Sequence, residues 1–500
     1  MKEHRCGRDR HLPLLPDRVI WIAANNASRI QLLEPKHIRA KYLALSYCWG
    51  PVGSDTYLTD VSTFNARKAG IRFNDLPPLF QDVVHCACAL GIEYIWIDRL
   101  CIIQDDGDDF KNQAPKMGEI YGNAALTIAA ASASSENDRI LVEREDKWCA
   151  GDLNMEVRGI GTLNLRLRRR THLLGKEDNG GDYGKSSTRA WIWQERLLAA
   201  RTVFFTPSAM KFECHRHSIW EGFDQDISGH SWSAQLDNIS HISWTTLVEE
   251  YMGRDITRPS DRLPAIESVM KRIENSTGWS PLWGLWANKL VESLGWQSKE
   301  AGIGIHACRM NPGHYAPTWS WASVDGPISY AFAQPIRDIE DFDQFYYNLE
   351  FRSLNAVSGL ITVAGHVISG ELNVRVKRNG LNVRHLHAFE EFEYKYLLRF
   401  SKNQKEYLVI PDVVLKPWSG KLNGQHISTV VRVPYGEAPP EESWTANCLY
   451  LLVGKMKMRS LFLLLGRSMR EPGAWERIGI VDGVSPTLFS MSQRQIIDIV

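Results

Sequence analysis

The chain has 500 residues, of which 44% are hydrophobic and 23% charged, a composition ordinary for a folded globular protein. Its 58 basic and 58 acidic residues cancel, so no global field attracts the chain to nucleic acid or to an anionic membrane. We expect no nucleic-acid partner, and we interpret the one dense basic run, Arg166 to Arg170, as a solvated strand edge.

The cysteines and the apolar runs indicate where the protein works. The nine cysteines are an odd number, and none is spaced Cys-x-x-Cys, so a disulfide framework is not expected and a reducing compartment is. Residues 1–16 lack the apolar core of a signal peptide. The run Leu461–Leu465 is too short to cross a bilayer. We expect a soluble, cytoplasmic protein with no membrane span.

Two short clusters contain potential metal ligands. Cys214–His217 and His85–Cys88 each place cysteine and histidine close together. Neither has a second ligand pair at the spacing that a structural zinc site generally needs. We therefore expect no metal.

From position 42 to 131 the pattern alternates between short apolar runs and helical spacing. Pro77-Pro78 and Gly91 bound the first helical segment, each at the end of a helix that it favours. Pro115 lies inside the second helical segment and predicts a kink or a later start. The predicted elements are a strand over Tyr42–Trp49, a helix over Leu79–Leu90, a strand over Ile92–Asp98, a helix over Phe110–Tyr121 and a strand over Ala124–Ala131.

Strands joined by helices predict a parallel sheet, because each crossover needs a helix to return across the sheet. Ligands of open α/β sheets gather at the carboxyl ends of the strands. Those ends carry Trp49-Gly50, then Asp98-Arg99, then Ser132 to Ser135. We expect a functional site where these three segments meet.

The rest of the chain has two further patterns, first a helical one and then one of short strands. The tryptophan-rich part has helical spacing, for example at Leu282, Trp286, Leu290 and Leu294. After Pro317, short alternating runs separated by turn residues predict antiparallel β structure. The charged stretch 175–185 predicts a flexible loop. We divide the chain into a tail (1–17), an α/β domain (18–230), a helical region (231–310) and a β-rich region (311–500), which makes the whole chain α+β.

Three blocks, in this order, resemble the HET domain of filamentous fungi. They are Tyr42–Gly50, then Tyr94–Gln104 followed by Met117–Tyr121, then Arg189–Leu198. Later segments, above all Pro317–Ser323, resemble the region that often follows HET domains. One departure is Ile103, where the family usually carries Asn, and the missing amide weakens the case for a polar ligand at that loop.

The resemblance implies a role in heterokaryon incompatibility, a form of fungal innate immunity in which non-self recognition triggers programmed cell death. HET domains are also regarded as similar to the TIR fold, a flavodoxin-like α/β module with a parallel sheet. Some TIR domains are NADases, which cleave NAD at the nicotinamide–ribose bond, whereas others only assemble signalling complexes. Under the first interpretation NAD is a substrate, and no cofactor is expected.

Glu195 is the candidate catalytic carboxylate. A nearby anion stabilises the oxocarbenium-like state through which a glycosidic bond breaks. Glu195 stands four residues after Trp191, so on a helix the two share a face, and this spacing resembles the motif around the catalytic Glu of TIR enzymes. An indole beside the carboxyl would raise its pKa. Alternatively, Glu195 pairs with Arg189 or Arg196 and anchors the helix.

Asp98 is the second catalytic candidate, because it ends a strand at the expected site. It would orient a ribose or pair with Arg189; a structural hydrogen bond that caps the next loop is the alternative. Trp49, Gly50, Arg189 and Trp191 are the candidates for contacting the nucleotide. We interpret Arg99 as facing solvent and Ser46 as satisfying a neighbouring backbone group. We interpret the pairs Trp191/Trp193 and Trp319/Trp321 as packing residues.

Two further interpretations belong to other classes of function. The chain could be a non-catalytic signalling module that acts by self-association or by recruiting a protein partner. It could also be a degenerate relative without death activity, which the departure at Ile103 keeps open.

Overall fold

The computed structural model describes residues 12–23, 29–50, 57–144, 151–159, 161–167, 188–215, 217–221, 239–299, 308–311, 316–330, 346–378, 392–400, 403–422, 424–455, 460–484 and 492–500, with a few single positions between them. The predicted loop 175–185 and residues 1–11 of the predicted tail lie outside these ranges. The chain packs into two compact units, one formed by residues 1–238 and 264–276 and the other by 239–263 and 277–500. The finer division into four parts remains a prediction.

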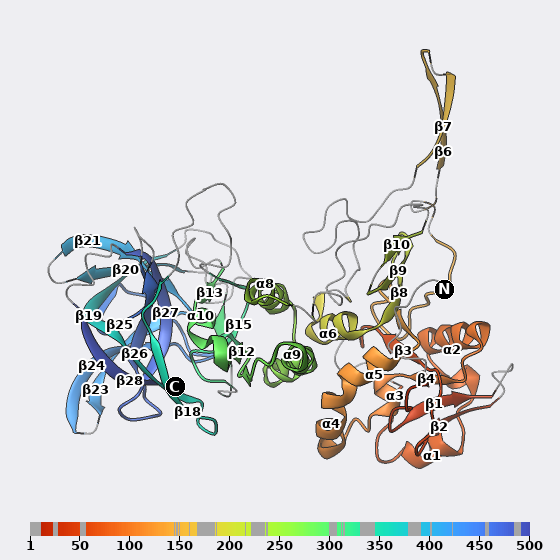
Figure 1. Cartoon of the computed structure of the whole chain (residues 1–500), viewed down its shortest axis with the longest axis horizontal. Coiled ribbons are helices and arrows are strands. Elements are labelled where there is room, and N and C mark those ends of the chain that lie inside the picture. Colours follow the sequence, from red (N-terminus) through yellow and green to blue (C-terminus); the bar gives the residue numbers. More distant parts are fainter. Residues whose placement is uncertain are drawn as a thin grey trace. The chain divides into compact units, whose positions relative to one another are not determined.

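The first unit is an α/β unit (Figure 1). Its strands are β1 (Val19–Ile22), β2 (Ile30–Leu33), β3 (Leu43–Ser46), β4 (Tyr94–Trp96), β5 (Leu126–Ala129), β6 (Gly151–Val157), β7 (Gly161–Leu167), β8 (Arg201–Phe205), β9 (Met210–Cys214) and β10 (Ser218–Trp220). Its helices are α1 (Phe64–Ala69), α2 (Pro78–Leu90), α3 (Asp98–Cys101), α4 (Gly107–Gln113), α5 (Met117–Asn123), α6 (Ala190–Leu198) and α9 (Pro264–Thr277), with 3₁₀ turns at Phe73–Asp75 and Ala114–Lys116.

Four parallel strands form the centre of an eight-stranded sheet with the order β10-β9-β8-β5-β3-β4-β1-β2. β3 pairs in parallel with β4 and with β5, and β5 pairs in parallel with β8. Antiparallel strands extend the sheet at both ends. In chain order the parallel strands lie 2-1-3-4, the order of flavodoxin-like sheets, in which ligands bind where the strand order reverses. That point lies between β3 and β5.

The predicted alternation of strand and helix over 42–131 is confirmed. α2 starts at Pro78, and Gly91 closes it with a left-handed φ of +66°, which glycine adopts without strain. Pro115 lies in the 3₁₀ turn that separates α4 from α5, so the predicted break occurs there. Residues 161–167 form β7, as the alternation predicted, whereas positions 168–170 of the basic run lie outside the described residues.

The second unit is mostly β structure. Its strands are β11 (Pro281–Leu282), β12 (Leu285–Trp286), β13 (Trp296–Ser298), β14 (Arg309–Met310), β15 (Val324–Asp325), β16 (Ile328–Tyr330), β17 (Tyr346–Tyr347), β18 (Glu350–Asn355), β19 (Leu360–Arg378), β20 (Phe392–Phe400), β21 (Asn403–Leu408), β22 (Ile410–Pro411), β23 (Leu415–Leu422), β24 (Gln425–Arg432), β25 (Trp444–Lys455), β26 (Ser460–Arg467), β27 (Trp475–Val484) and β28 (Gln493–Ile499). Its helices are α8 (His241–Met252) and α10 (Leu290–Ser293), with 3₁₀ turns at Pro259–Asp261, Ala287–Lys289 and Trp321–Ser323.

The large sheet of this unit closes on itself. β25, β26, β27, β28 and β19 pair in succession, and β19 also pairs with β25. Strands of the closed sheet are buried and apolar along much of their length. β26, for example, is buried from Ser460 through Gly466. The predicted antiparallel β structure of the C-terminal region is therefore confirmed.

The helical spacing of Leu282, Trp286, Leu290 and Leu294 does not correspond to one helix. Leu282 pairs with Leu285 in a two-stranded turn between β11 and β12, and the helix α10 begins only at Leu290. Trp283 and Gly284 both have positive φ values, +48° and +84°, which a helix excludes. The helical spacing had a different cause: the apolar side chains at these positions are all buried against the rest of the unit.

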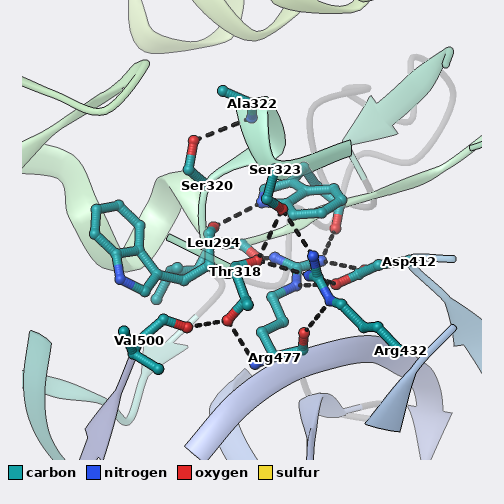
Figure 2. Close-up of polar contacts among 11 residues, drawn as sticks. Leu294, Thr318, Ser320, Ala322, Ser323, Asp412, Arg432, Arg477 and Val500 are labelled. Carbon is teal, nitrogen blue, oxygen red and sulfur yellow. Dashed lines mark hydrogen bonds and ion pairs between the residues drawn. The ribbon is translucent and has the colours of Figure 1, made fainter. Parts of the chain in front are cut away.

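A buried polar cluster joins distant segments of the second unit (Figure 2). The Asp412 carboxylate accepts hydrogen bonds from Arg477 Nε at 3.0 Å and from Arg432 Nη2 at 3.3 Å, and all three residues are at most 4% exposed. Arg477 also donates to the carbonyls of Leu294 and Trp296. One carboxylate thus faces two guanidinium groups in the core, and these groups also donate to main-chain carbonyls and to the Ser323 hydroxyl.

The segment around Trp319 packs onto this cluster. Arg432 donates to the Thr318 carbonyl, and the indole N–H groups of Trp319 and Trp321 donate to the carbonyls of Gly359 and Gly284. Both indoles are fully buried. The interpretation of Trp319 and Trp321 as packing residues is confirmed.

Candidate functional site

The three predicted strand ends lie together. The Trp49 indole N–H donates to Asp98 Oδ2 at 2.7 Å, and the Arg99 guanidinium lies 4.7 Å from the centroid of the Trp49 ring. A Cβ atom on Gly50 would lie 2.9 Å from the Cβ of Ser135, so the segments after β3 and β5 are in close contact. The chain therefore gathers these residues at the point where the strand order reverses, as the parallel pattern predicted.

Arg99 does not face solvent, which corrects the interpretation from the sequence. It is 5% exposed, donates to the Trp49 carbonyl at 3.0 Å and forms an ion pair with Glu136 at 2.5 Å. Glu136 also accepts the backbone N–H of Tyr57. Glu136 comes from the segment after β5, about forty residues away in the chain, and no local pattern around Arg99 reveals such a partner.

Asp98 is the first residue of α3, and its carboxylate bonds the backbone of this helix and the segment after β3. Its Oδ1 accepts the backbone N–H of Arg99 at 2.7 Å, and its Oδ2 accepts the Trp49 indole. The side chain is half-buried. Burial raises the pKa of Asp98, and the hydrogen bond from Trp49 opposes this rise. Asp98 therefore forms structural hydrogen bonds, which was the alternative to a role in orienting a ribose. The bond to the indole also positions the Trp49 ring.

Glu195 lies in α6 with its side chain directed into the unit, only 4% exposed. Burial raises its pKa to about 8; the Ser46 hydroxyl, within hydrogen-bonding reach, opposes the rise, and the charge of Asp98 adds to it. The carboxyl is therefore mostly protonated at neutral pH. Among the described residues, its Oε2 has no hydrogen-bond partner.

The arginines weighed above do not form an ion pair with Glu195 in the described part of the chain. Arg196 pairs with Glu213 at 3.3 Å, and Arg189 only attracts the Glu195 carboxyl at a distance, as the weakest influence on its pKa. Trp191 is half-buried at the start of α6, and its ring meets Phe110 edge-on, with centroids 6.4 Å apart. No ion pair with a described residue anchors Glu195, so burial and the nearby Ser46 hydroxyl have the largest influence on its pKa.

The sequence did not indicate that two hydroxyl groups, those of Ser46 and Tyr121, lie close to Glu195. The Ser46 hydroxyl lies within hydrogen-bonding reach of Glu195 and lowers the pKa of that carboxyl. The Tyr121 hydroxyl, from α5, donates to the Leu45 carbonyl at 3.0 Å and also lies within hydrogen-bonding reach of Glu195. Tyr121 stands in the second block of the resemblance, and a polar group on the buried side of a helix was the signal that could have identified it.

The arrangement brings together two carboxyl groups in different environments. Glu195 is buried and its pKa is raised to about 8, whereas Asp98 is half-buried and accepts two N–H donors. Pairs of this kind can divide acid and base roles at one pH. Oε2 of Glu195 has no hydrogen-bond partner among the described residues, so it can bond a further group.

Gly50 should be intolerant of a side chain. Its φ of +87° is strained for other residues, and a methyl group would press on Ser135. We expect Gly50→Ala to lower the free energy of unfolding of the first unit by roughly 1–3 kcal/mol, measured by chemical denaturation. Gly151→Ala, where no atom lies within 4 Å of the added Cβ, is the control and should change little. Equal effects of the two substitutions would contradict the close contact between the strand ends.

Groups of three or more potential metal ligands do not occur among the described residues, which include most of both clusters considered above. No helix in that part of the chain is long and apolar enough to cross a membrane.

Residues 42–195 match the family model described as heterokaryon incompatibility protein (HET). Neither the search of curated proteins nor the search of solved structures returned a match. The matched segment begins just before β3 and ends at Glu195, so it contains the three gathered strand ends and both carboxyl groups. Residues 42–195 are thus the part of this chain that is similar to the heterokaryon incompatibility (HET) family.

Proposed function

We propose that this protein is an effector of heterokaryon incompatibility in fungi, that it acts in the cytoplasm, and that its TIR-like first unit triggers programmed cell death by cleaving NAD. The observation that carries the enzymatic part is the buried Glu195 carboxyl, one of whose oxygens has no hydrogen-bond partner among the described residues and whose pKa the charge of Asp98 helps to raise. The match of residues 42–195 to the HET family supports the role in incompatibility.

The reaction breaks the bond between ribose C1′ and the nicotinamide nitrogen. The bonding electron pair leaves with nicotinamide, the ribose becomes an oxocarbenium-like cation, and water adds to C1′ and releases a proton. An ionised Glu195 stabilises that cation. Because the nicotinamide ring of NAD is itself cationic, its approach lowers the pKa of Glu195 and favours the charged form.

The surrounding residues have separate roles in this proposal. Asp98 keeps the Trp49 ring in place through its indole hydrogen bond, so that the ring can contact the nucleotide. Gly50 allows the backbone after β3 to approach the bound molecule, and Trp191 and Arg189 contact it from the start of α6. No cofactor is required, since NAD is the substrate.

The test is release of nicotinamide from NAD by the purified full chain. We expect Glu195→Gln to abolish release and Glu119→Gln, on the exposed side of the neighbouring helix α5, to leave it unchanged. Because ionised Glu195 is the active form, kcat/KM should rise with pH until the pH passes about 8, the pKa of the free enzyme. Release that persists in Glu195→Gln would overturn the assignment.

The burial of Glu195 supports a second candidate function. A carboxyl that is 4% exposed and neutral can belong to the core of a non-catalytic module that signals by self-association or by recruiting a partner. Forced oligomerisation of the full chain separates the two: an NADase then consumes NAD, whereas the non-catalytic module recruits a partner and leaves the NAD concentration unchanged.

A further inference from the structure

Helix α9 belongs to the first unit, although the chain on both sides of it belongs to the second. Residues 264–276 pack with the first unit, whereas residues 239–263 and 277–500 form the second unit. The chain thus leaves the second unit, contributes one helix to the first and returns. What this helix can transmit between the units depends on the residues that it contacts and on how its two ends are held.

Within the first unit, α9 contacts α5 and α6 through Ser268. The Ser268 backbone N–H donates to Gln194 Oε1 at 3.2 Å, and its hydroxyl donates to the Pro115 carbonyl at 3.4 Å. A Cβ atom on Gly118 would lie 2.5 Å from the Cβ of Ser268 and 3.0 Å from Cδ1 of Leu198. The three helices are therefore in close contact, and a glycine is needed where they meet.

This contact lies next to the candidate catalytic carboxyl. Gln194, which is 1% exposed, directly precedes Glu195 in α6. Tyr121, one turn after Gly118 in α5, lies within hydrogen-bonding reach of Glu195. Seven of the nine residues of α6 are buried, as expected for a helix that is covered on several sides. α9 thus packs on the two helices that carry Tyr121 and Glu195.

The proposed reaction requires this site to open. Glu195 is 4% exposed, so the ribose of NAD cannot reach its carboxyl in the arrangement described. Enzymes commonly admit their substrates by moving a helix or a loop that covers the site. Local openings of this kind are limited by the contacts that must be broken. A helix that holds α5 and α6 together therefore controls how often Glu195 becomes accessible.

Both ends of α9 are held in the second unit. Arg262 is 2% exposed, donates to the Arg254 carbonyl at 3.0 Å and forms an ion pair with Asp325. On the other side, the Trp279 ring contacts the buried Trp286 ring, with centroids 5.5 Å apart. A single residue separates α9 from Arg262 at one end and from Trp279 at the other. Such short connections have no slack, so a displacement of their anchors is passed to α9.

We propose that α9 regulates access to Glu195. It holds α5 and α6 together over the carboxyl, and a rearrangement of the second unit displaces α9 through its two short connections and opens the site. The consequence for NAD cleavage rests on the proposed function, whereas the opening itself does not. Because coupling between two sites is reciprocal, loosening α9 in the first unit also loosens its anchors in the second.

The experiment is hydrogen exchange of the full chain with the variant Gly118→Ala. The added methyl group overlaps the Cβ of Ser268, so α5 and α9 must move apart. We expect peptides from α6 to exchange about tenfold faster, since overpacking of this kind shifts an opening equilibrium by roughly that factor. Nicotinamide release should increase by a similar factor. Unchanged exchange in α6 would overturn the proposal.

Two further variants separate this effect from a general loss of stability. Gly118→Ala/Ser268→Gly removes the Cβ that the new methyl group meets, so exchange in α6 should return toward that of the unmodified chain. Gly107→Ala, in the exposed first turn of α4, adds the same methyl group with no atom within 4 Å and should change nothing. A double variant that exchanges as fast as Gly118→Ala would show that α9 does not hold α6.

The role of the second unit has its own measurement in the same experiment. Peptides that contain Arg262 should also exchange faster in Gly118→Ala, and unchanged exchange there would overturn transmission between the units. Exchange is measured without NAD, so the two proposals fail separately. Absence of nicotinamide release from every variant refutes NAD cleavage and leaves the exchange result to decide the role of α9. If the unmodified chain releases nicotinamide and Gly118→Ala opens α6 without faster release, control of the reaction is refuted.

Discussion

Replacing Asp412 by Asn should destabilise the second unit by about 3–5 kcal/mol, the range measured when one partner of a buried ion pair is removed. Asp412 is fully buried, and its carboxylate is the anion that faces both Arg432 and Arg477. Burial lowers the pKa of each guanidinium, and Asp412 opposes this. Without the carboxylate, two positive charges remain in the core, and an Asn side chain cannot neutralise them.

The measurement is chemical denaturation followed by tryptophan fluorescence, with hydrogen exchange of peptides from β24 and β27 to assign the loss to the second unit. Glu406→Gln is the control, because Glu406 pairs with Arg375, a side chain that is 63% exposed. An exposed pair of this kind contributes about 0–1 kcal/mol. If both substitutions cost the same small amount, the buried cluster does not hold these segments together.

The second large effect concerns pH and Glu195. Its pKa is raised by burial from 4.5 to about 8, so folding favours the protonated form. The protonated carboxyl makes its full contribution to the free energy of unfolding below about pH 4.5. This contribution is lost as the pH rises toward 8. Gln is neutral at every pH. Glu195→Gln should therefore match the unmodified chain in stability near pH 4.5 and exceed it by roughly 3–5 kcal/mol near pH 9.

Denaturation curves at several pH values measure this difference for the first unit. Glu119→Gln, an exposed glutamate on α5, should show no pH-dependent difference. A constant offset between Glu195→Gln and the unmodified chain at all pH values would show that Glu195 does not change its charge on folding. The outcome does not depend on NAD cleavage, so it tests the environment of the carboxyl apart from the proposed reaction.

Local patterns were sufficient for the main strands and helices between residues 42 and 131. Short apolar runs and helical spacing predicted the strands and helices between 42 and 131, and Pro115 and Gly91 marked a break and an end, because both residues act on their own backbone. Parallel pairing followed from the alternation, and it predicted that Trp49, Asp98 and Ser135 would approach one another. Parallel strands end at the same edge of the sheet, whatever side chains they carry.

Local patterns failed where a contact joins residues far apart in the chain. Helical spacing from Leu282 described burial rather than a helix, because a turn at Trp283-Gly284 also buries apolar side chains at such intervals. The ion pairs Arg99–Glu136 and Arg477–Asp412 form only in the folded chain. The same holds for the approach of Ser46 and Tyr121 to Glu195.

What the sequence predicted and what only the folded structure determined differ for one physical reason, the range of the interactions involved. Backbone preferences and apolar periodicity act over a few residues, so they can be recognised in the amino-acid sequence alone. The resemblance to HET domains can be recognised in the same way. The charge state of a buried group depends on which distant side chains surround it and on how much water they exclude. Folding therefore decided that the pKa of Glu195 is raised and that Arg99 is paired with Glu136.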